Sequence, residues 1–118
     1  MVMGWKNILQ VIAPDLAVFD HSPTANLGSR SISMKRAFFG TGFYAPPQMS
    51  PMPTIRPWLE APLQRFQSSE NRALQAINPV LERIDAPVLE KLMNLFDCDE
   101  NFLTTFPELD HYQERGSV

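Results

Sequence analysis

Two polar residues follow a short apolar run near the start of the chain, and their position suggests chemistry. The run 16–19 is typical of a buried strand, and Asp20 and His21 come directly after it. Open α/β sheets hold ligands beyond the carboxyl ends of their strands. A carboxylate there can orient a histidine that acts as a general base, because it stabilises the imidazolium that forms. Adjacent residues seldom bond each other in this way, so the histidine would come from another segment.

A structural interpretation of the same residues stays open. Asp20 would then cap the helix that Pro23 begins, and His21 would only fill space. Ser22 is not favoured as a nucleophile, because the glycine-flanked turn that exposes a catalytic serine is absent. We treat Asp20 as the candidate catalytic residue, with His21 and Ser22 as candidate substrate-binding residues.

A glycine turn follows a second apolar run, 37–39. Gly40 and Gly42 flank Thr41, and Phe43 comes next. Glycine permits a sharp turn and a close approach of the backbone to a ligand. The pattern is too short for a dinucleotide fingerprint, which needs a third glycine at the start of a helix. These residues alone favour a turn in which the glycines only relieve backbone crowding, and substrate binding by Gly40, Thr41, Gly42 and Phe43 is the alternative. We expect no cofactor.

Acidic side chains gather near the end of the chain without the spacing of a metal site. The stretch 97–100 places three carboxylates around Cys98, and Asp110 and His111 add an acid and an imidazole. Structural zinc usually has paired Cys or His at short spacings, and catalytic zinc needs three protein ligands. We expect no metal, and Cys98 is interpreted as a small apolar side chain in the core.

Helices and strands alternate along the chain in a way that would position these residues. Apolar spacing predicts an N-terminal helix that Pro14 ends, a strand at 16–19 buried on both faces, a helix at 23–31 and further strands at 37–39 and 102–106. A strand–helix–strand unit joins parallel strands, so both strand ends lie at one edge of the sheet. The fold class predicted is α/β, a partial Rossmann-like domain with a small parallel sheet of about three strands and flanking helices.

The remainder of the chain predicts a loop and two more helices. Five of the 11 prolines fall between Pro46 and Pro57, so 44–57 is interpreted as a proline-rich loop. Helical spacing then runs from about Leu59 to Ile84, where Pro79 should kink or divide the helix. A shorter helix is expected to follow Pro87 and to end near Phe96.

Composition narrows the class of protein. The 118 residues suffice for one domain, and 44% hydrophobic with 19% charged residues is typical of globular proteins. A net charge of −3 without a basic run argues against nucleic acid as a partner. No apolar stretch is long enough to span a membrane, and the single cysteine gives no sign of an oxidising compartment. We therefore expect a cytoplasmic location.

Several of these motifs together resemble bacterial members of the UDP-glycosyltransferase-like family. The similar segments are 14–24, 39–43 with Pro46-Pro47, and 102–112, the last being similar to the stretch that closes the N-terminal domain of that family. The resemblance covers nearly the whole chain. It implies the acceptor-side domain of a two-domain (GT-B) enzyme that transfers a sugar, with inversion, from a nucleotide sugar to an acceptor hydroxyl.

The resemblance also assigns roles to residues. In many relatives a histidine after the first strand deprotonates the acceptor, supported by an aspartate at the end of a later strand, and Asp20 matches that aspartate. The turn from Gly40 to Phe43 would lie beside the acceptor. Neither His21 nor His111 matches the base histidine, and no segment matches a donor nucleotide site.

These departures lead us to expect that 1–118 forms a single incomplete Rossmann-like domain that is inactive alone. Its ligand would be a small-molecule acceptor. Because a truncated parallel sheet exposes strand edges and apolar faces, we also expect self-association or a complementary domain. The alternative is a non-catalytic α/β module that binds a protein through its proline-rich loop or exposed sheet edge.

Overall fold

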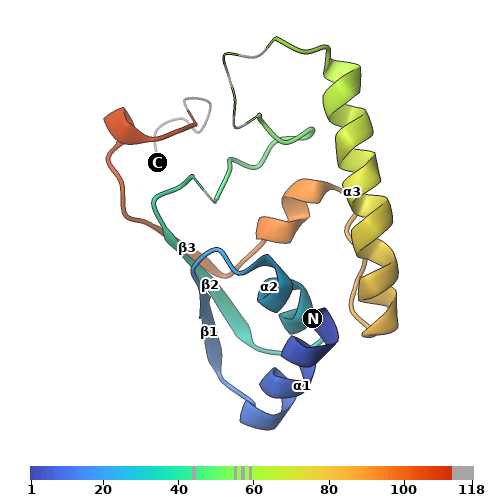
Figure 1. Cartoon of the computed structure of the whole chain (residues 1–118). Helices are drawn as coiled ribbons and strands as arrows, with labels where there is room; N and C mark the ends of the chain where they lie inside the picture. The colour runs from blue at the N-terminus through green and yellow to red at the C-terminus, as the bar shows by residue number, and fades with distance from the viewer. Residues whose placement is uncertain (44, 55, 57, 59, 113–118) are drawn as a thin grey trace.

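The computed structural model of the chain describes residues 1–43, 45–54, 56, 58 and 60–112. Helices and strands alternate through its first half, and the long helix α3 stands along one side (Figure 1). The elements are α1 (Val2–Ile12), β1 (Leu16–Phe19), α2 (Pro23–Ser29), β2 (Lys35–Gly40), α3 (Leu63–Arg83), the 3-10 helix η1 (Leu92–Phe96), β3 (Glu100–Leu103) and the 3-10 helix η2 (Pro107–Leu109).

The strands form one parallel sheet, as predicted. Their order is β1-β2-β3, and Val18 lies opposite Ala37 while Phe38 lies opposite Asn101. The first strand has its predicted bounds, and the second extends beyond them at both ends. The third strand was predicted at 102–106 and is Glu100–Leu103 instead. It begins earlier because the Asp99 N–H donates to the Arg36 carbonyl at 2.8 Å and aligns the chain beside β2. The α/β class with a small parallel sheet is confirmed.

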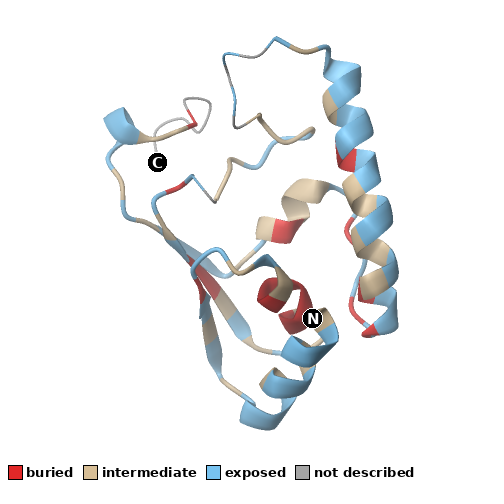
Figure 2. Ribbon diagram, viewed as in Figure 1, coloured by how far each residue is buried: buried red, intermediate tan, exposed pale blue. Residues whose placement is uncertain are grey.

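Two clusters of buried residues hold the elements together, and Figure 2 colours the buried residues red along the ribbon. In the first, Phe19 and Phe38 lie under Ala25 of α2, with ring centroids 5.9 Å apart. In the second, Leu81 and Ile84 at the end of α3 pack with Leu27 of α2 and with the segment leading into η1. The helices therefore cover one face of the sheet.

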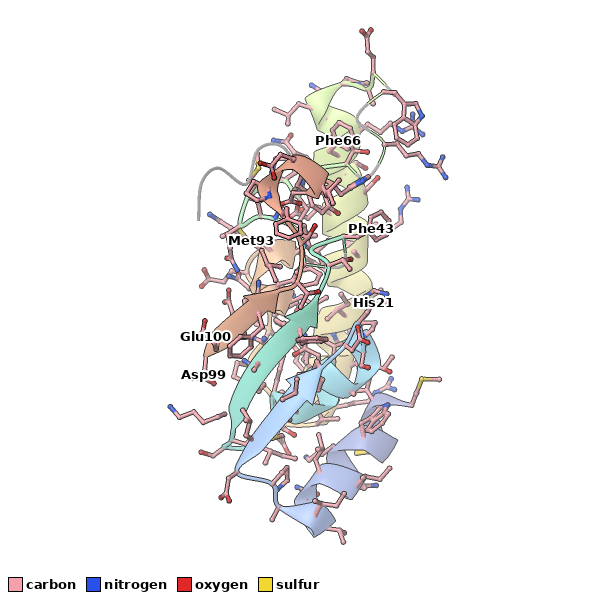
Figure 3. All side chains as sticks on the ribbon, turned by 90° about the vertical axis from the view of Figure 1, so that its left-hand side faces the viewer. His21, Phe43, Phe66, Met93, Asp99 and Glu100 are labelled. Carbon is pink, nitrogen blue, oxygen red and sulfur yellow. The ribbon has the colours of Figure 1, made fainter. Side chains whose placement is uncertain are left out.

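The other face of the sheet is open. Leu16 and Val18 are 54% and 61% exposed, and Phe39 and Phe102 on the neighbouring strands are 50% and 55% exposed. In Figure 3 this face is turned toward the viewer, with the helices behind it. The prediction that β1 is buried on both faces is wrong, because no element among the described residues covers these side chains.

The later helices differ from the prediction in two places. Pro79 was predicted to kink or divide the long helix, and it lies inside the continuous helix α3, so the helix is not divided there. The predicted helix after Pro87 is only the 3-10 helix η1, because Asn78 bonds both backbone groups of Leu89 and holds that segment extended. None of the helices in the described ranges is long and apolar enough to span a bilayer.

The proline-rich segment has neither helix nor strand at 45–54 or 56, the residues of 44–57 that the structure describes. Tyr44, Ile55 and Pro57 of this predicted loop lie outside the described residues, as does Leu59, where the long helix was predicted to begin.

Candidate functional site

A small, largely apolar cavity lies beyond the carboxyl ends of β1 and β2. Its volume is about 50 Å³, and its walls come from the β1–α2 turn, the end of β2 with the following turn, and η1. The cavity is lined by Phe19, Asp20, His21, Ser22, Pro23, Asn26, Phe38, Phe39, Gly40, Gly42, Ala45, Leu95 and Phe96. Five of the seven predicted site residues thus meet at one cavity: Asp20, His21, Ser22, Gly40 and Gly42.

The Asp20 carboxylate faces the end of β2. A Cβ added to Gly40 would lie 3.9 Å from Asp20 Oδ1, so the two predicted positions lie next to each other. Asp20 is exposed and its carboxylate makes no hydrogen bond to any described residue. Ser22, and not Asp20, is the N-cap of α2, and its hydroxyl donates to the Asp20 carbonyl at 3.3 Å instead of capping the helix. The Asp20 carboxylate is therefore available to a ligand.

The two turns that bring these residues together have unusual backbone conformations. His21 has φ 42°, which is uncommon for a residue with a side chain and turns the chain sharply from β1 into α2. Gly42 is buried with φ 89°, a conformation that favours glycine. Gly42 thereby provides the turn that the sequence predicted after β2.

Thr41 and Phe43 are not part of the cavity wall, although the sequence grouped them with it. Thr41 is exposed on the turn. Phe43 packs against His111, with ring centroids 4.8 Å apart, and its carbonyl accepts a hydrogen bond from the Tyr112 hydroxyl at 3.1 Å. Phe43 therefore ties the segment 110–112 to the turn, beside the cavity and outside it.

Sequence reasoning missed the residues that form the inner wall. Asn26 is 2% exposed, and its Nδ2 donates to the Leu95 carbonyl at 2.7 Å. Its Oδ1 accepts a hydrogen bond from Arg36 Nη1 at 3.1 Å. The only local signal is a polar residue within a short helix between Ala25 and Leu27. The contact with η1 joins residues 69 positions apart, which one sequence does not reveal.

The acidic side chains of the stretch 97–100 lie in and around the start of β3. Within the described ranges no group of three or more His, Cys, Asp or Glu side chains is placed to hold a metal ion. Cys98 packs against the Phe19 and Phe38 cluster, as interpreted from the sequence, and burial raises the pKa of its thiol. A thiol with a raised pKa is a weaker nucleophile at neutral pH.

The arrangement combines an apolar hollow with a carboxylate that bonds no other residue of the described part of the chain. At about 50 Å³ the cavity admits only one end of a ligand. Asp20 can accept a hydrogen bond from a hydroxyl at that end, while the phenylalanine walls contact a small apolar group beside it. Comparison of the chain with protein-family models, with curated proteins and with solved structures finds no match.

Proposed function

We propose that the chain forms the acceptor-side part of a sugar-nucleotide glycosyltransferase. The observation that carries this proposal is the placement of Asp20 against Gly40 at the mouth of one cavity, where two parallel strands end. Two of the three sequence segments that resemble the UDP-glycosyltransferase-like family, 14–24 and 39–43, contribute residues to this cavity. A cytoplasmic location is part of the proposal.

In the proposed enzyme, Asp20 orients a base histidine and stabilises the imidazolium that forms when the acceptor hydroxyl loses its proton. His21 is next to Asp20 in the chain, and His111 packs on Phe43 outside the cavity, so the base comes from another part of the complete enzyme. General-base assistance contributes roughly 10²- to 10⁴-fold in rate, and positioning contributes more. The chain alone therefore binds acceptor without transferring sugar.

Acceptor binding by this cavity can be measured by ligand-observed NMR. A panel of hydroxylated aromatic and alicyclic compounds would be screened against the wild type, Asp20→Asn and Ala45→Trp, because Ala45 lines the cavity and tryptophan would fill it. Gln75→Ala, on the distant exposed side of α3, is the matched control. We expect a compound that binds the wild type and the control and loses about tenfold or more in the two cavity variants.

Failure to bind any compound, or binding that both cavity variants leave unchanged, contradicts the proposal. Nucleotide sugars provide a second arm. Micromolar binding of a nucleotide sugar to this chain would contradict its assignment to the acceptor side alone.

The open face of the sheet supports a second candidate, a non-catalytic interaction module. Val18, Phe39 and Phe102 present apolar side chains from three parallel strands, and parallel sheets are normally covered on both faces. A protein partner bound to this face, together with an acceptor screen that finds no ligand, would favour this candidate.

A further inference from the structure

A second, more polar cavity lies at the opposite end of β2 from the acceptor cavity. Its volume is about 220 Å³, and it is bordered by the end of α2, the segment leading into β2, and Pro87. Four polar side chains line it: Ser29, Arg30, Ser33 and Arg36. The two cavities are linked, because Arg36 of this cavity donates from Nη1 to Oδ1 of Asn26 in the wall of the acceptor cavity, at 3.1 Å.

Arg30 is held beside this cavity with unused hydrogen-bonding capacity. Its Nη1 donates to the Asn94 carbonyl at 3.2 Å, whereas its Nε is buried and has no hydrogen-bond partner among the described residues. Buried donors without a partner are rare and costly. Burial, and after it the positive charge of Arg36, lowers the pKa of Arg30 below its usual value. Two guanidinium groups are thus close enough to repel each other.

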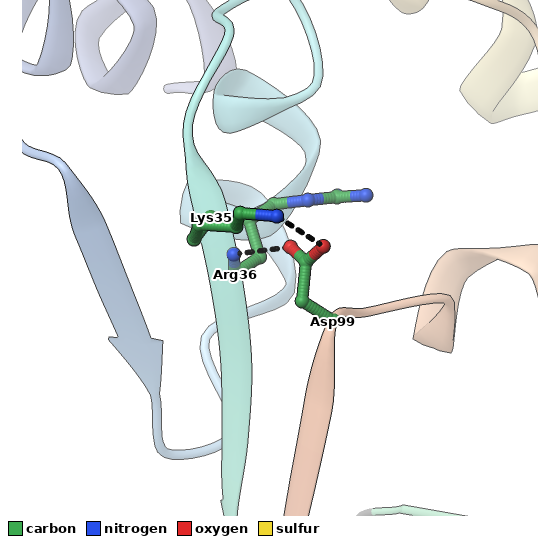
Figure 4. Close-up of polar contacts among 3 residues, drawn as sticks. All are labelled: Lys35, Arg36 and Asp99. Carbon is green, nitrogen blue, oxygen red and sulfur yellow. Dashed lines mark hydrogen bonds and ion pairs between the residues drawn. The ribbon is translucent and has the colours of Figure 1, made fainter.

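The nearby carboxylates do not neutralise this pair by direct contact. Asp99 is engaged by the Arg36 backbone N–H at 2.8 Å and by Lys35 Nζ at 3.7 Å, as Figure 4 shows. Asp97 accepts a hydrogen bond from Asn94 Nδ2 at 3.2 Å, and its charge acts on Arg30 less strongly than that of Arg36. Lys35 with Asp99 is the one ion pair within 4.0 Å in the described part of the chain.

The remaining polar group is the Ser33 hydroxyl. Ser33 is exposed, and its side chain has no hydrogen bond to another described residue. Ser29 contributes no free donor, because it is fully buried and its hydroxyl donates to the Asn26 carbonyl at 2.6 Å. Ser33 and the two arginines therefore supply donors, and no carboxylate lines the cavity.

We propose that this cavity binds a small oxyanion of the phosphate type, held by Arg30, Arg36 and Ser33. Guanidinium groups match the geometry of phosphate oxygens and bind them through charge-assisted hydrogen bonds. The cavity is smaller than the roughly 300 Å³ of pockets for drug-sized ligands, which favours a single phosphate group over a nucleotide. None of the proposed phosphate-binding residues lines the acceptor cavity, although Arg36 also bonds Asn26 in the wall of that cavity. Phosphate binding does not rest on the proposed transfer activity.

Isothermal titration with inorganic phosphate and with glycerol phosphate tests the proposal. The variants are Arg36→Gln, which removes one guanidinium, and Ser33→Asp, which places a carboxylate among the donors without removing an internal contact. Arg72→Gln, an exposed arginine on α3, is the matched control. We expect Arg36→Gln and Ser33→Asp to weaken binding by about tenfold or more, and Arg72→Gln to leave it unchanged.

Tighter binding of glycerol phosphate than of inorganic phosphate would identify a phosphate ester as the ligand class, and equal binding would identify free phosphate. Ser33→Asp keeps the test valid if Arg36→Gln fails to fold, since Arg36 also bonds Asn26. The proposal is overturned if neither anion binds the wild type, or if a folded Ser33→Asp protein binds them as tightly as the wild type does.

Discussion

Asp99 secures the start of β3 with its carboxylate. The carboxylate accepts a hydrogen bond from the Arg36 backbone N–H at 2.8 Å and lies 3.7 Å from Lys35 Nζ (Figure 4). The backbone hydrogen bond is the main cause that lowers the pKa of Asp99 below its ordinary value, and the Lys35 charge contributes less. A single side chain therefore couples the pairing of β2 and β3 to pH.

This coupling predicts an effect of acid on stability. Because the folded-state pKa lies below the unfolded value of about 3.9, ionised Asp99 stabilises the fold above roughly pH 4 and this contribution is lost as pH falls through the folded-state pKa. We expect Asp99→Asn to be less stable than the wild type at neutral pH, with the difference shrinking on acidification. Urea unfolding across this pH range measures it.

Lys35→Gln is the control for that experiment. It removes the weaker of these two causes and leaves the backbone hydrogen bond, so most of the pH dependence should remain. A stability difference between Asp99→Asn and the wild type that stays constant with pH would contradict the role given to this carboxylate.

At the scale of elements, α1 packs closely against α2 at Gly28. A Cβ added to Gly28 would lie 2.9 Å from Trp5 Cβ, 2.9 Å from the Val2 carbonyl oxygen and 3.0 Å from the Lys6 backbone nitrogen. Backbone atoms cannot move aside without displacing the whole helix. We expect Gly28→Ala to lower the free energy of unfolding by about 1–3 kcal/mol, the usual cost of overpacking.

Gly4→Ala is the matched control within the same helix pair. A Cβ at Gly4 would meet nothing within 4 Å, so alanine should stabilise α1 by about 0.5–1 kcal/mol through its higher helix propensity. Thermal and urea unfolding of the two variants should therefore shift in opposite directions. Equal shifts would show that the contact of α1 with α2 is looser than the structure indicates.

A buried carboxylate on α3 joins two further segments. Glu70 is 8% exposed, and its oxygens accept hydrogen bonds from the Met52 and Leu92 backbone N–H groups, each at 3.0 Å. Glu70→Gln turns one acceptor into a donor that faces an N–H group. We expect a loss of about 1–3 kcal/mol in unfolding free energy, with earlier proteolysis near Met52. Glu82→Gln, on the exposed part of α3, should change stability by less than about 0.5 kcal/mol.

The elements that the sequence predicted well are those whose signals are local. β1 follows a compact apolar run, α2 begins at Pro23, and both ends of β2 lie near its predicted bounds. The helix expected after Pro87 failed because Asn78 competes for the backbone of Leu89, a contact between residues 11 positions apart. Hydrogen bonding by a distant side chain overrode the local signal of Pro87.

In the candidate site, too, the features that follow from local signals were predicted and those that depend on distant contacts were not. Asp20 and Gly40 could be placed at one sheet edge because parallel connectivity requires it, and they do lie together. The contact between Asn26 and Leu95 could not be predicted from the sequence, because it depends on where η1 packs against α2. Phe43 was grouped with the cavity by its neighbours in sequence, whereas the packing of His111 draws it outward.

At the scale of the whole molecule, the described residues cover only one side of the sheet. The second layer of helices packs on Phe19 and Phe38, while Val18, Phe39 and Phe102 remain at least half exposed on the other side. Contiguous apolar surface of this kind is rare on monomers and marks an interaction surface or a tendency to aggregate. The open face, with unpaired strand edges beside it, is therefore the expected place of contact in any self-association.

We expect the isolated chain to associate with itself as its concentration rises from micromolar to millimolar, which sedimentation velocity can follow. The double variant Val18→Lys with Phe102→Lys places a charge on each outer strand of the open face, where burial of an unpaired charge is costly, and should remain monomeric over the same range. Leu63→Lys alters an apolar residue that is 59% exposed on α3, and it should associate as the wild type does.

A wild type that stays monodisperse and monomeric, with a high melting temperature, would contradict the prediction, because the open face would then need no partner to cover it. If Leu63→Lys abolished association while the double variant still associated, the contact would lie on α3 and not on the sheet.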